Sequence, residues 1–159
     1  MPVRAVPAAK VPEAAMLSHE DMSAFTHALT AARGQFTNAT KALCVEFALG
    51  PRGPWIIGLV GRDPIAPHEL ASFFNVGRSL ITAELNKLIE AGLIAHEKDA
   101  TDGRRVALSL TTAGRKVYDR LGEDLDTFLT QRLSTYSREE VMLCTRLLSD
   151  FATGGGRAA

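Results

Sequence analysis

A short polar turn with two arginines, followed at once by alternating apolar residues, constrains the fold of this chain more than any other segment. Segment 99–103 is polar and turn-like, and segment 104–110 alternates polar and apolar residues. Alternation with a period of two is typical of a half-buried β-strand. Together with the short apolar segment 93–98, the pattern predicts a β-hairpin whose tip carries Arg104 and Arg105.

Two short helices joined by a tight turn are predicted just before this hairpin. Pro67 opens the first helix, Asn75-Val76-Gly77 form the turn, and Gly92 ends the second helix. Proline suits the first helical position, and glycine suits the position after the last turn. The apolar spacing of the second helix predicts three buried positions, Ile81, Leu85 and Leu88. A helix-turn-helix followed by an arginine-tipped hairpin is typical of a winged-helix DNA-binding module.

The outward face of the second helix is rich in short polar side chains, which can hydrogen-bond base edges or phosphates. We expect DNA contacts from Arg78, Ser79, Thr82, Asn86 and Lys87. At the hairpin tip, Arg104 and Arg105 are expected to reach a groove or the phosphate backbone, with Asp102 holding the Arg104 guanidinium in one orientation. A polar face on an isolated helix is most simply a solvated surface, but the neighbouring helix and hairpin favour DNA binding.

Apolar seams at helical spacing flank this module on both sides. One covers residues 22–47 and predicts one long helix, and the others cover 117–133 and 141–151. Either the core of this chain or a partner chain can cover such seams. The expected N-caps of these helices are Ser18, Thr111 and Ser137, the last in a capping box with Glu140.

Composition agrees with one globular domain. The chain has 159 residues, of which 46% are hydrophobic, and it is long enough to bury a substantial core. No apolar run reaches the length of a membrane span, and we expect a cytoplasmic protein. The net charge is zero; residues 76–117 hold seven Lys/Arg against five Asp/Glu, and residues 118–150 hold four against seven. Charge alone therefore does not decide for or against nucleic acid.

The sequence shows no motif of an enzyme or of a cofactor site. Its histidines match no metal-binding pattern, and it has neither a phosphate-binding glycine loop nor a signature of paired carboxylates. We therefore expect no enzymatic activity, no metal and no cofactor.

Two alternatives remain open. Cys44 and Cys144 lack disulfide or metal spacing and fall on apolar stripes, where cysteine is most often a small buried hydrophobe. An oxidation sensor would need an exposed thiol with a lowered pKa, and only Arg146 is a close cationic neighbour in sequence. The second alternative is a winged helix that binds proteins; the basic hairpin tip favours DNA.

The order of these residues resembles the signature of the MarR (multiple antibiotic resistance regulator) family of bacterial winged-helix regulators. The resemblance covers residues 20–152 and is most specific at the wing, where D-x-R is followed by L-T-x-x-G. It is carried by Leu70-Ala71, Val76, Ser79, Ile81-Thr82, Leu88, Gly92-Leu93-Ile94, Asp102, Arg104, Leu110-Thr111 and Gly114.

The resemblance implies a mainly α fold with a small β-hairpin wing (α+β), in which a winged helix-turn-helix is joined to N- and C-terminal dimerisation helices. It implies a homodimer that binds a pseudo-palindromic double-stranded DNA operator. The expected segments are a flexible arm (1–17), one domain (18–152, with dimerisation helices in 18–49 and 111–152 and a DNA-binding lobe in 54–110) and a flexible tail (153–159).

The resemblance also implies that a small phenolic or anionic ligand releases the DNA. We therefore expect a ligand-responsive repressor whose effector is an aromatic acid or its coenzyme A thioester. A junction between elements is a common place for such a site, and Arg33 or Arg52 would neutralise a carboxylate. The other residues expected to line the site are Phe36, Thr40, Trp55 and Leu59.

Three positions depart from the family pattern. Ala83 stands where many members have an arginine, and Ala66 stands where a serine or threonine usually caps the first motif helix. His96 occupies a strand position that is often basic, so that a pH-dependent contact is conceivable.

Overall fold

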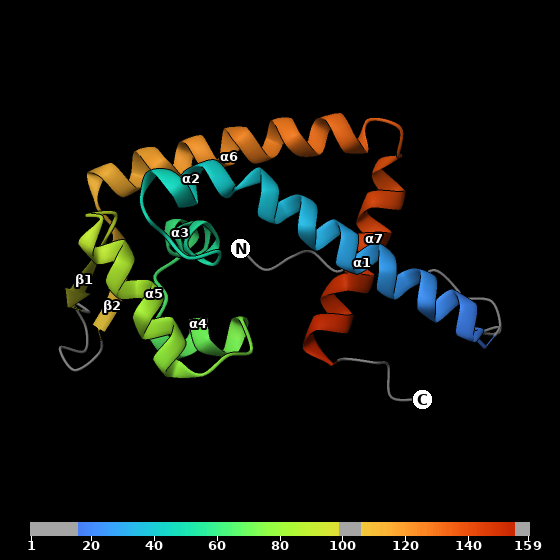
Figure 1. The fold of residues 1–159 in the computed structure, drawn as a ribbon, viewed down its shortest axis with the longest axis horizontal. Helices are drawn as coiled ribbons and strands as arrows, with labels where there is room; N and C mark the ends of the chain where they lie inside the picture. The colour runs from blue at the N-terminus through green and yellow to red at the C-terminus, as the bar shows by residue number, and fades with distance from the viewer. Residues whose placement is uncertain (1–15, 99–105, 155–159) are drawn as a thin grey trace. The chain divides into compact units, whose positions relative to one another are not determined.

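The computed structural model describes residues 16–98 and 106–154. They divide into two compact units between Phe36 and Thr37. The predicted fold class is confirmed: the described residues form helices and one small antiparallel sheet (Figure 1). The elements are α1 (His19–Ala39), α2 (Lys41–Glu46), α3 (Gly53–Arg62), α4 (Pro67–Phe73), α5 (Arg78–Glu90), β1 (Ile94–Lys98), β2 (Val106–Leu110), α6 (Thr112–Leu133) and α7 (Arg138–Thr153).

The prediction of one long helix over residues 22–47 was wrong. Helix α1 continues through Gly34 but ends at Ala39, and α2 begins at Lys41. Between them Thr40 is buried, and its hydroxyl donates to the carbonyl of Thr37 at 3.3 Å. Such a bond from side chain to backbone competes with the regular helical ladder. The break leaves α2 as a separate short helix that contributes to the core of the second unit.

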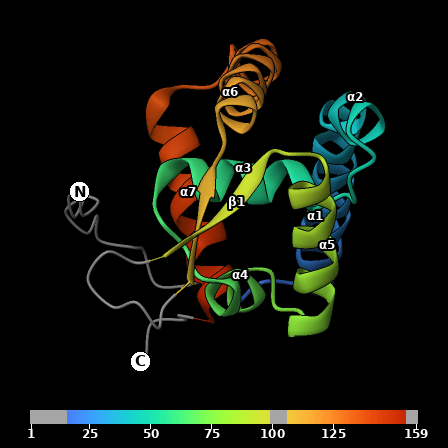
Figure 2. The ribbon, with the colours of Figure 1, turned by 90° about the vertical axis from the view of Figure 1, so that its left-hand side faces the viewer.

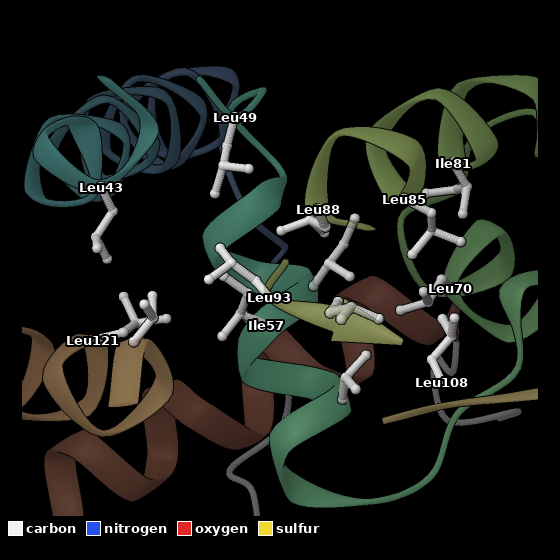
Figure 3. Packing of buried hydrophobic residues seen from close by; sticks show 14 of the residues in the cluster. Leu43, Leu49, Ile57, Leu70, Ile81, Leu85, Leu88, Leu93, Leu108 and Leu121 are labelled. Atoms are coloured by element: carbon white, nitrogen blue, oxygen red, sulfur yellow. The ribbon is translucent and has the colours of Figure 1, made fainter. Parts of the chain in front are cut away.

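Helix α3 is the centre of that core. Its Ile56 and Ile57 are completely buried, and α2, α5, α6 and β2 all contact it. In Figure 2, α3 crosses the middle of this unit with α5, α4 and β1 around it. The buried apolar side chains close around α3 in one cluster, which Figure 3 shows.

Helix α6 contributes to the same core, which corrects part of the predicted dimerisation seam. Val117 and Leu121 are buried within the chain, and Leu43 of α2 is buried in the same cluster (Figure 3). These three positions belong to the core of the chain because α6 packs against α3. A partner chain cannot reach them without unfolding this core.

Helix α7 buries none of its residues, and neither does α1. On α7 the exposed fraction is 64% for Phe151 and 56% for Leu143. The ends of α7 are nonetheless complete: Ser137 and Glu140 form the predicted capping box, and Gly154 ends the helix with a φ of 67°. The apolar face of α7 is therefore formed, and its large apolar residues are exposed.

The joint between the sheet and α6 explains why the motif L-T-x-x-G has its form. The Thr111 hydroxyl accepts the N–H of Gly114 at 2.9 Å and donates to the carbonyl of Gly92 at 2.6 Å. A Cβ on Gly114 would lie 1.9 Å from the backbone oxygen of Leu93. Thr111 thus caps α6, as predicted, and Gly114 allows the helix to approach the start of β1.

Candidate nucleic-acid interface

Helix α5 has one buried face and one exposed face. Ile81, Leu85 and Leu88 are buried, as the sequence predicted. The helix begins after Gly77, which is extended, and the chain leaves it at Gly92 with a φ of 69°. This positive φ is cheap for glycine and lets the chain turn directly into β1.

The side chains expected to contact DNA lie together on the other face of α5. All of them are exposed, as is Ala83: the residues are Arg78, Ser79, Thr82, Asn86 and Lys87. The hydroxyl of Thr82 donates to the carbonyl of Arg78 at 3.0 Å. The face therefore presents two cations, one amide and several short side chains to solvent, while the opposite face anchors the helix to the core.

A hollow of about 470 Å³ lies at the turn between α4 and α5. It is lined by His68, Ala71, Ser72, Asn75, Val76, Gly77 and Arg78. Asn75 makes the sharp turn with a φ of 49°. His68, Ser72 and Asn75 are not among the residues that the sequence predicted to contact DNA. All three are exposed beside the start of α5 because the tight turn brings them there. The first N–H groups of a helix have no partner within it and attract anions.

The stem of the predicted hairpin is confirmed. Strands β1 and β2 pair antiparallel from Ile94 opposite Leu110 to Lys98 opposite Val106. The backbone N–H of Leu108 also donates to the carbonyl of Ile65 at 3.3 Å, which ties the stem to the segment before α4. His96 of β1 is exposed. Asp102, Arg104 and Arg105 lie outside the described residues, so their placement stays a prediction.

An acidic residue on the inner side of α5 was not anticipated. Glu84 is 6% exposed, and its Oε2 has no hydrogen-bond partner among the described residues. A Cβ on Gly50 would lie 2.2 Å from this carboxylate, so any larger residue there would displace the carboxylate from this position. Glu84 falls between the apolar positions of α5, and helical spacing alone would have indicated that it is buried.

Cys44 lies near the same two residues, Gly50 and Glu84. Its thiol donates to the carbonyl of Gly50 at 3.6 Å. Burial, and then the charge of the Glu84 carboxylate, raise the pKa of the Cys44 thiol. Cys144 is exposed on α7 instead of buried. A raised pKa disfavours the thiolate, which is the form that oxidants attack.

The residues expected to bind an effector are divided between the two units. Arg33 and Phe36 belong to α1, in the first unit. In the second unit, Thr40 is buried, and its hydroxyl donates to the carbonyl of Thr37. Three further residues of this unit are half-buried: Arg52, which is the N-cap of α3, and Trp55 and Leu59, which lie on α3. A pocket formed by these residues stays a prediction.

No group of three or more His, Cys, Asp or Glu side chains that would hold a metal ion occurs in residues 16–98 and 106–154. No helix within these ranges is both long enough and apolar enough to cross a membrane.

Comparison with protein families finds the MarR family, whose model matches residues 54–105. Among curated proteins, the regulator FarR of Neisseria gonorrhoeae is 34% identical over 85 residues, which is 54% of this chain and 58% of FarR. The homoprotocatechuate degradative operon repressor of Escherichia coli is 29% identical over 104 residues, which is 64% of this chain and 70% of that protein. The chain thus matches little more than half the length of FarR.

Solved structures share the fold over most of the chain. NadR in complex with 4-hydroxyphenylacetate has a TM-score of 0.69 and 25% identity, with 89% of this chain and 98% of NadR covered. BldR from Sulfolobus solfataricus has a TM-score of 0.65 and 26% identity, with 82% and 95% covered. FarR, the E. coli repressor and BldR are named as regulators of transcription, not as enzymes. The resemblance seen in the sequence is confirmed: residues 54–105 match the model of the MarR family, and the chain is similar to regulators of transcription such as FarR and BldR.

Proposed function

We propose that this protein is a transcriptional repressor that binds a pseudo-palindromic DNA operator as a homodimer and leaves it when a small aromatic acid binds. The observation that carries the proposal is the exposed polar face of α5, which is fixed to the core through Ile81, Leu85 and Leu88. In this proposal residues 54–110 form the DNA-binding lobe, and the dimer contacts come from segments 18–49 and 111–152.

DNA recognition divides between base edges and phosphates. An exposed helix that stands on a rigid core can enter the major groove with its side chains already placed. Lys87 and Arg78 supply positive charge on that face. The hollow at the turn, with His68, Ser72 and Asn75, faces solvent beside the first turn of α5 and suits a phosphate. The expected wing contacts Arg104 and Arg105, with Asp102 orienting Arg104, would add a second site of contact.

A homodimer follows from the exposed apolar face of α7. Its exposed large apolar residues include Met142, Leu143, Leu147, Leu148 and Phe151. Exposed apolar surface of this extent along one helix is costly in water and marks a protein interface. A second copy of the chain would cover it and place two α5 helices one DNA turn apart, the spacing that pseudo-palindromic half-sites require.

The effector class is argued from relatives and from charge. NadR is described in complex with 4-hydroxyphenylacetate, and the E. coli relative is named for homoprotocatechuate degradation. Both names refer to aromatic acids. In the second unit of this chain the guanidinium of Arg52 would bind the carboxylate, and Thr40, Trp55 and Leu59 would surround the ring. Arg33 and Phe36, in the first unit, stay candidates from the sequence alone. A coenzyme A thioester of such an acid is the second candidate.

The alternatives have less support. A redox-sensing regulator needs a reactive thiol, whereas the pKa of Cys44 is raised. A winged helix that binds only proteins has no need for the cations on the exposed face of α5.

Selection of duplexes from a randomised DNA library tests DNA binding directly. We expect one enriched pseudo-palindromic motif, bound by two chains. Lys87→Ala should lower the slope of log K against log salt by about 0.9, the value for one lost phosphate contact, if Lys87 binds the backbone. The control is Lys41→Ala, an exposed cation on α2 that should leave the slope unchanged. Enrichment of no sequence would refute the proposal.

Titration with 4-hydroxyphenylacetate and its coenzyme A thioester tests the effector. Binding should quench the fluorescence of Trp55 and weaken the operator complex, and Arg52→Met should raise the Kd for the acid about tenfold or more because a charge-assisted hydrogen bond is lost. Arg62→Met, which removes an exposed arginine at the other end of α3, is the matched control. An operator complex that resists both compounds but responds to peroxide would favour the redox alternative.

A further inference from the structure

The centre of the outward face of α5 presents methyl groups and one amide, whereas its cations lie toward the ends. Thr82 and Ala83 are exposed, and Asn86 follows them after one helical turn, so that the side chain of Asn86 neighbours both of them on the helix surface. Arg78 is the first residue of the helix, and Lys87 lies in its last turn. The side chains that usually pair with guanine therefore flank this centre.

The hydroxyl of Thr82 is already engaged. It donates its single hydrogen to the carbonyl of Arg78 at 3.0 Å, and it therefore has no hydrogen to offer a base. What Thr82 presents outward is a methyl group and the lone pairs of its oxygen. Ala83 presents a methyl group alone. Two adjacent methyl groups thus occupy the middle of a surface that is otherwise polar.

The bases differ in what they offer to such a surface. Thymine alone carries a methyl group in the major groove, and apolar contact with it is a standard form of recognition. Asparagine pairs with adenine in a bidentate way through the N6 amino group and N7. The Thr82 oxygen would also accept a hydrogen bond from the adenine amino group.

We propose that the centre of α5 reads A·T pairs: a thymine methyl packs against Ala83 and the methyl of Thr82, and the amide of Asn86 binds an adenine of the same or the next pair. This inference rests on the proposed function and adds the identity of the bases. Guanine contacts are assigned only to the ends of the helix, at Arg78 and Lys87.

The first test uses the motif selected by the full-length protein. We expect each half-site to contain an adenine and a thymine in the same or adjacent pairs, at positions sensitive to mutation. An enriched motif whose sensitive positions are all G·C pairs would overturn this inference but leave the proposed function intact. Failure to enrich any sequence would overturn both.

The second test removes single groups from DNA and protein. Replacing the half-site thymine by uracil deletes only the methyl group, and wild-type protein should bind about threefold to fourfold more weakly, the loss expected for one buried methyl. Thr82→Ser keeps the hydroxyl and should reduce this ratio, whereas Thr82→Val keeps the methyl and should preserve it. The double variant Thr82→Ser/Ala83→Gly should bind both duplexes equally. If the wild-type protein binds the uracil-containing duplex as tightly as the thymine-containing one, the proposed thymine contact is wrong.

The third test concerns Asn86. Replacing the adenine by 7-deazaadenine removes the N7 acceptor and should weaken binding by the wild type about tenfold, as expected for part of a bidentate pair. Asn86→Ala should bind both duplexes with the same reduced affinity. If Asn86→Ala retains full sensitivity to the 7-deaza substitution, another residue reads the adenine and the assignment is wrong. Circular dichroism of each variant checks that α5 remains folded.

Discussion

Helices α5 and α7 are both amphipathic, but of the two only α5 buries residues within the part of the chain that the structure describes. Ile81, Leu85 and Leu88 of α5 lie in the core around α3, whereas α7 buries no residue at all. Helix α7 nevertheless has the more complete caps, with a box at Ser137 and a left-handed glycine at its end. Local capping and tertiary burial are therefore separate requirements, and α7 satisfies only the first without a partner.

Truncating the core under α5 should have the largest effect on folding. Leu88→Ala removes a completely buried side chain and should lower the free energy of unfolding by about 2–5 kcal/mol. Leu80→Ala on the same helix, at a position that is 39% exposed, should change it by less than about 0.5 kcal/mol. Urea denaturation measures both. Equal effects of the two variants would show that α5 does not pack as described.

Charging the open face of α7 should separate dimerisation from folding of the lobe. Leu147→Asp is expected to give a monomer in sedimentation velocity and to weaken operator binding about 100-fold or more, because two half-sites are no longer engaged together. Glu139→Ala, in the exposed first turn of α7, should remain a dimer. Leu43→Asp is unsuited to this test because Leu43 is part of the core. Retention of the dimer by Leu147→Asp would place the interface elsewhere.

Two glycines of α6 should respond with opposite signs. Gly114→Ala drives a Cβ into the backbone oxygen of Leu93 and should destabilise the protein by about 1–3 kcal/mol. Gly122→Ala meets no atom within 4 Å and should stabilise it by about 0.5–1 kcal/mol, as expected for alanine in a helix interior. Thermal melts of the two variants decide this. Stabilisation by Gly114→Ala would refute the close contact between α6 and the sheet.

The caps of α7 should give the smallest effect. Hydrogen bonds with Ser137 lower the pKa of Glu140. Their stabilising contribution is therefore complete above the ordinary pKa of 4.5 and is lost as pH falls through the lower value of the folded state. Ser137→Ala should cost about 1 kcal/mol of helix stability. It should reduce this acid-dependent loss of ellipticity at 222 nm without abolishing it, because the backbone N–H of residue 137 still donates to Glu140. Glu140→Gln should remove the loss. Persistence of the loss in Glu140→Gln would assign it to another carboxyl.

Much of the helix-turn-helix was predictable, as were the caps of the helices that follow it, because their signals are local. The turn residues Asn75 and Gly77, the cap Thr111 and the capping box at Ser137 each act within four residues of themselves. The outward face of α5 also followed from local spacing, since Ile81, Leu85 and Leu88 leave the other side of the helix exposed. Interactions between residues within one helical turn of each other can therefore be predicted from the sequence alone.

The tertiary structure decided which apolar seams the chain covers by itself. Val117 and Leu121 on α6 and the apolar residues of α7 follow the same helical spacing, yet only the former pack against α3. The contact between the Glu84 carboxylate and Gly50 likewise joins residues that are distant in sequence. Helical periodicity predicts that one face of a helix will be buried. It does not predict which surface covers that face, because this depends on packing between elements that are distant in sequence.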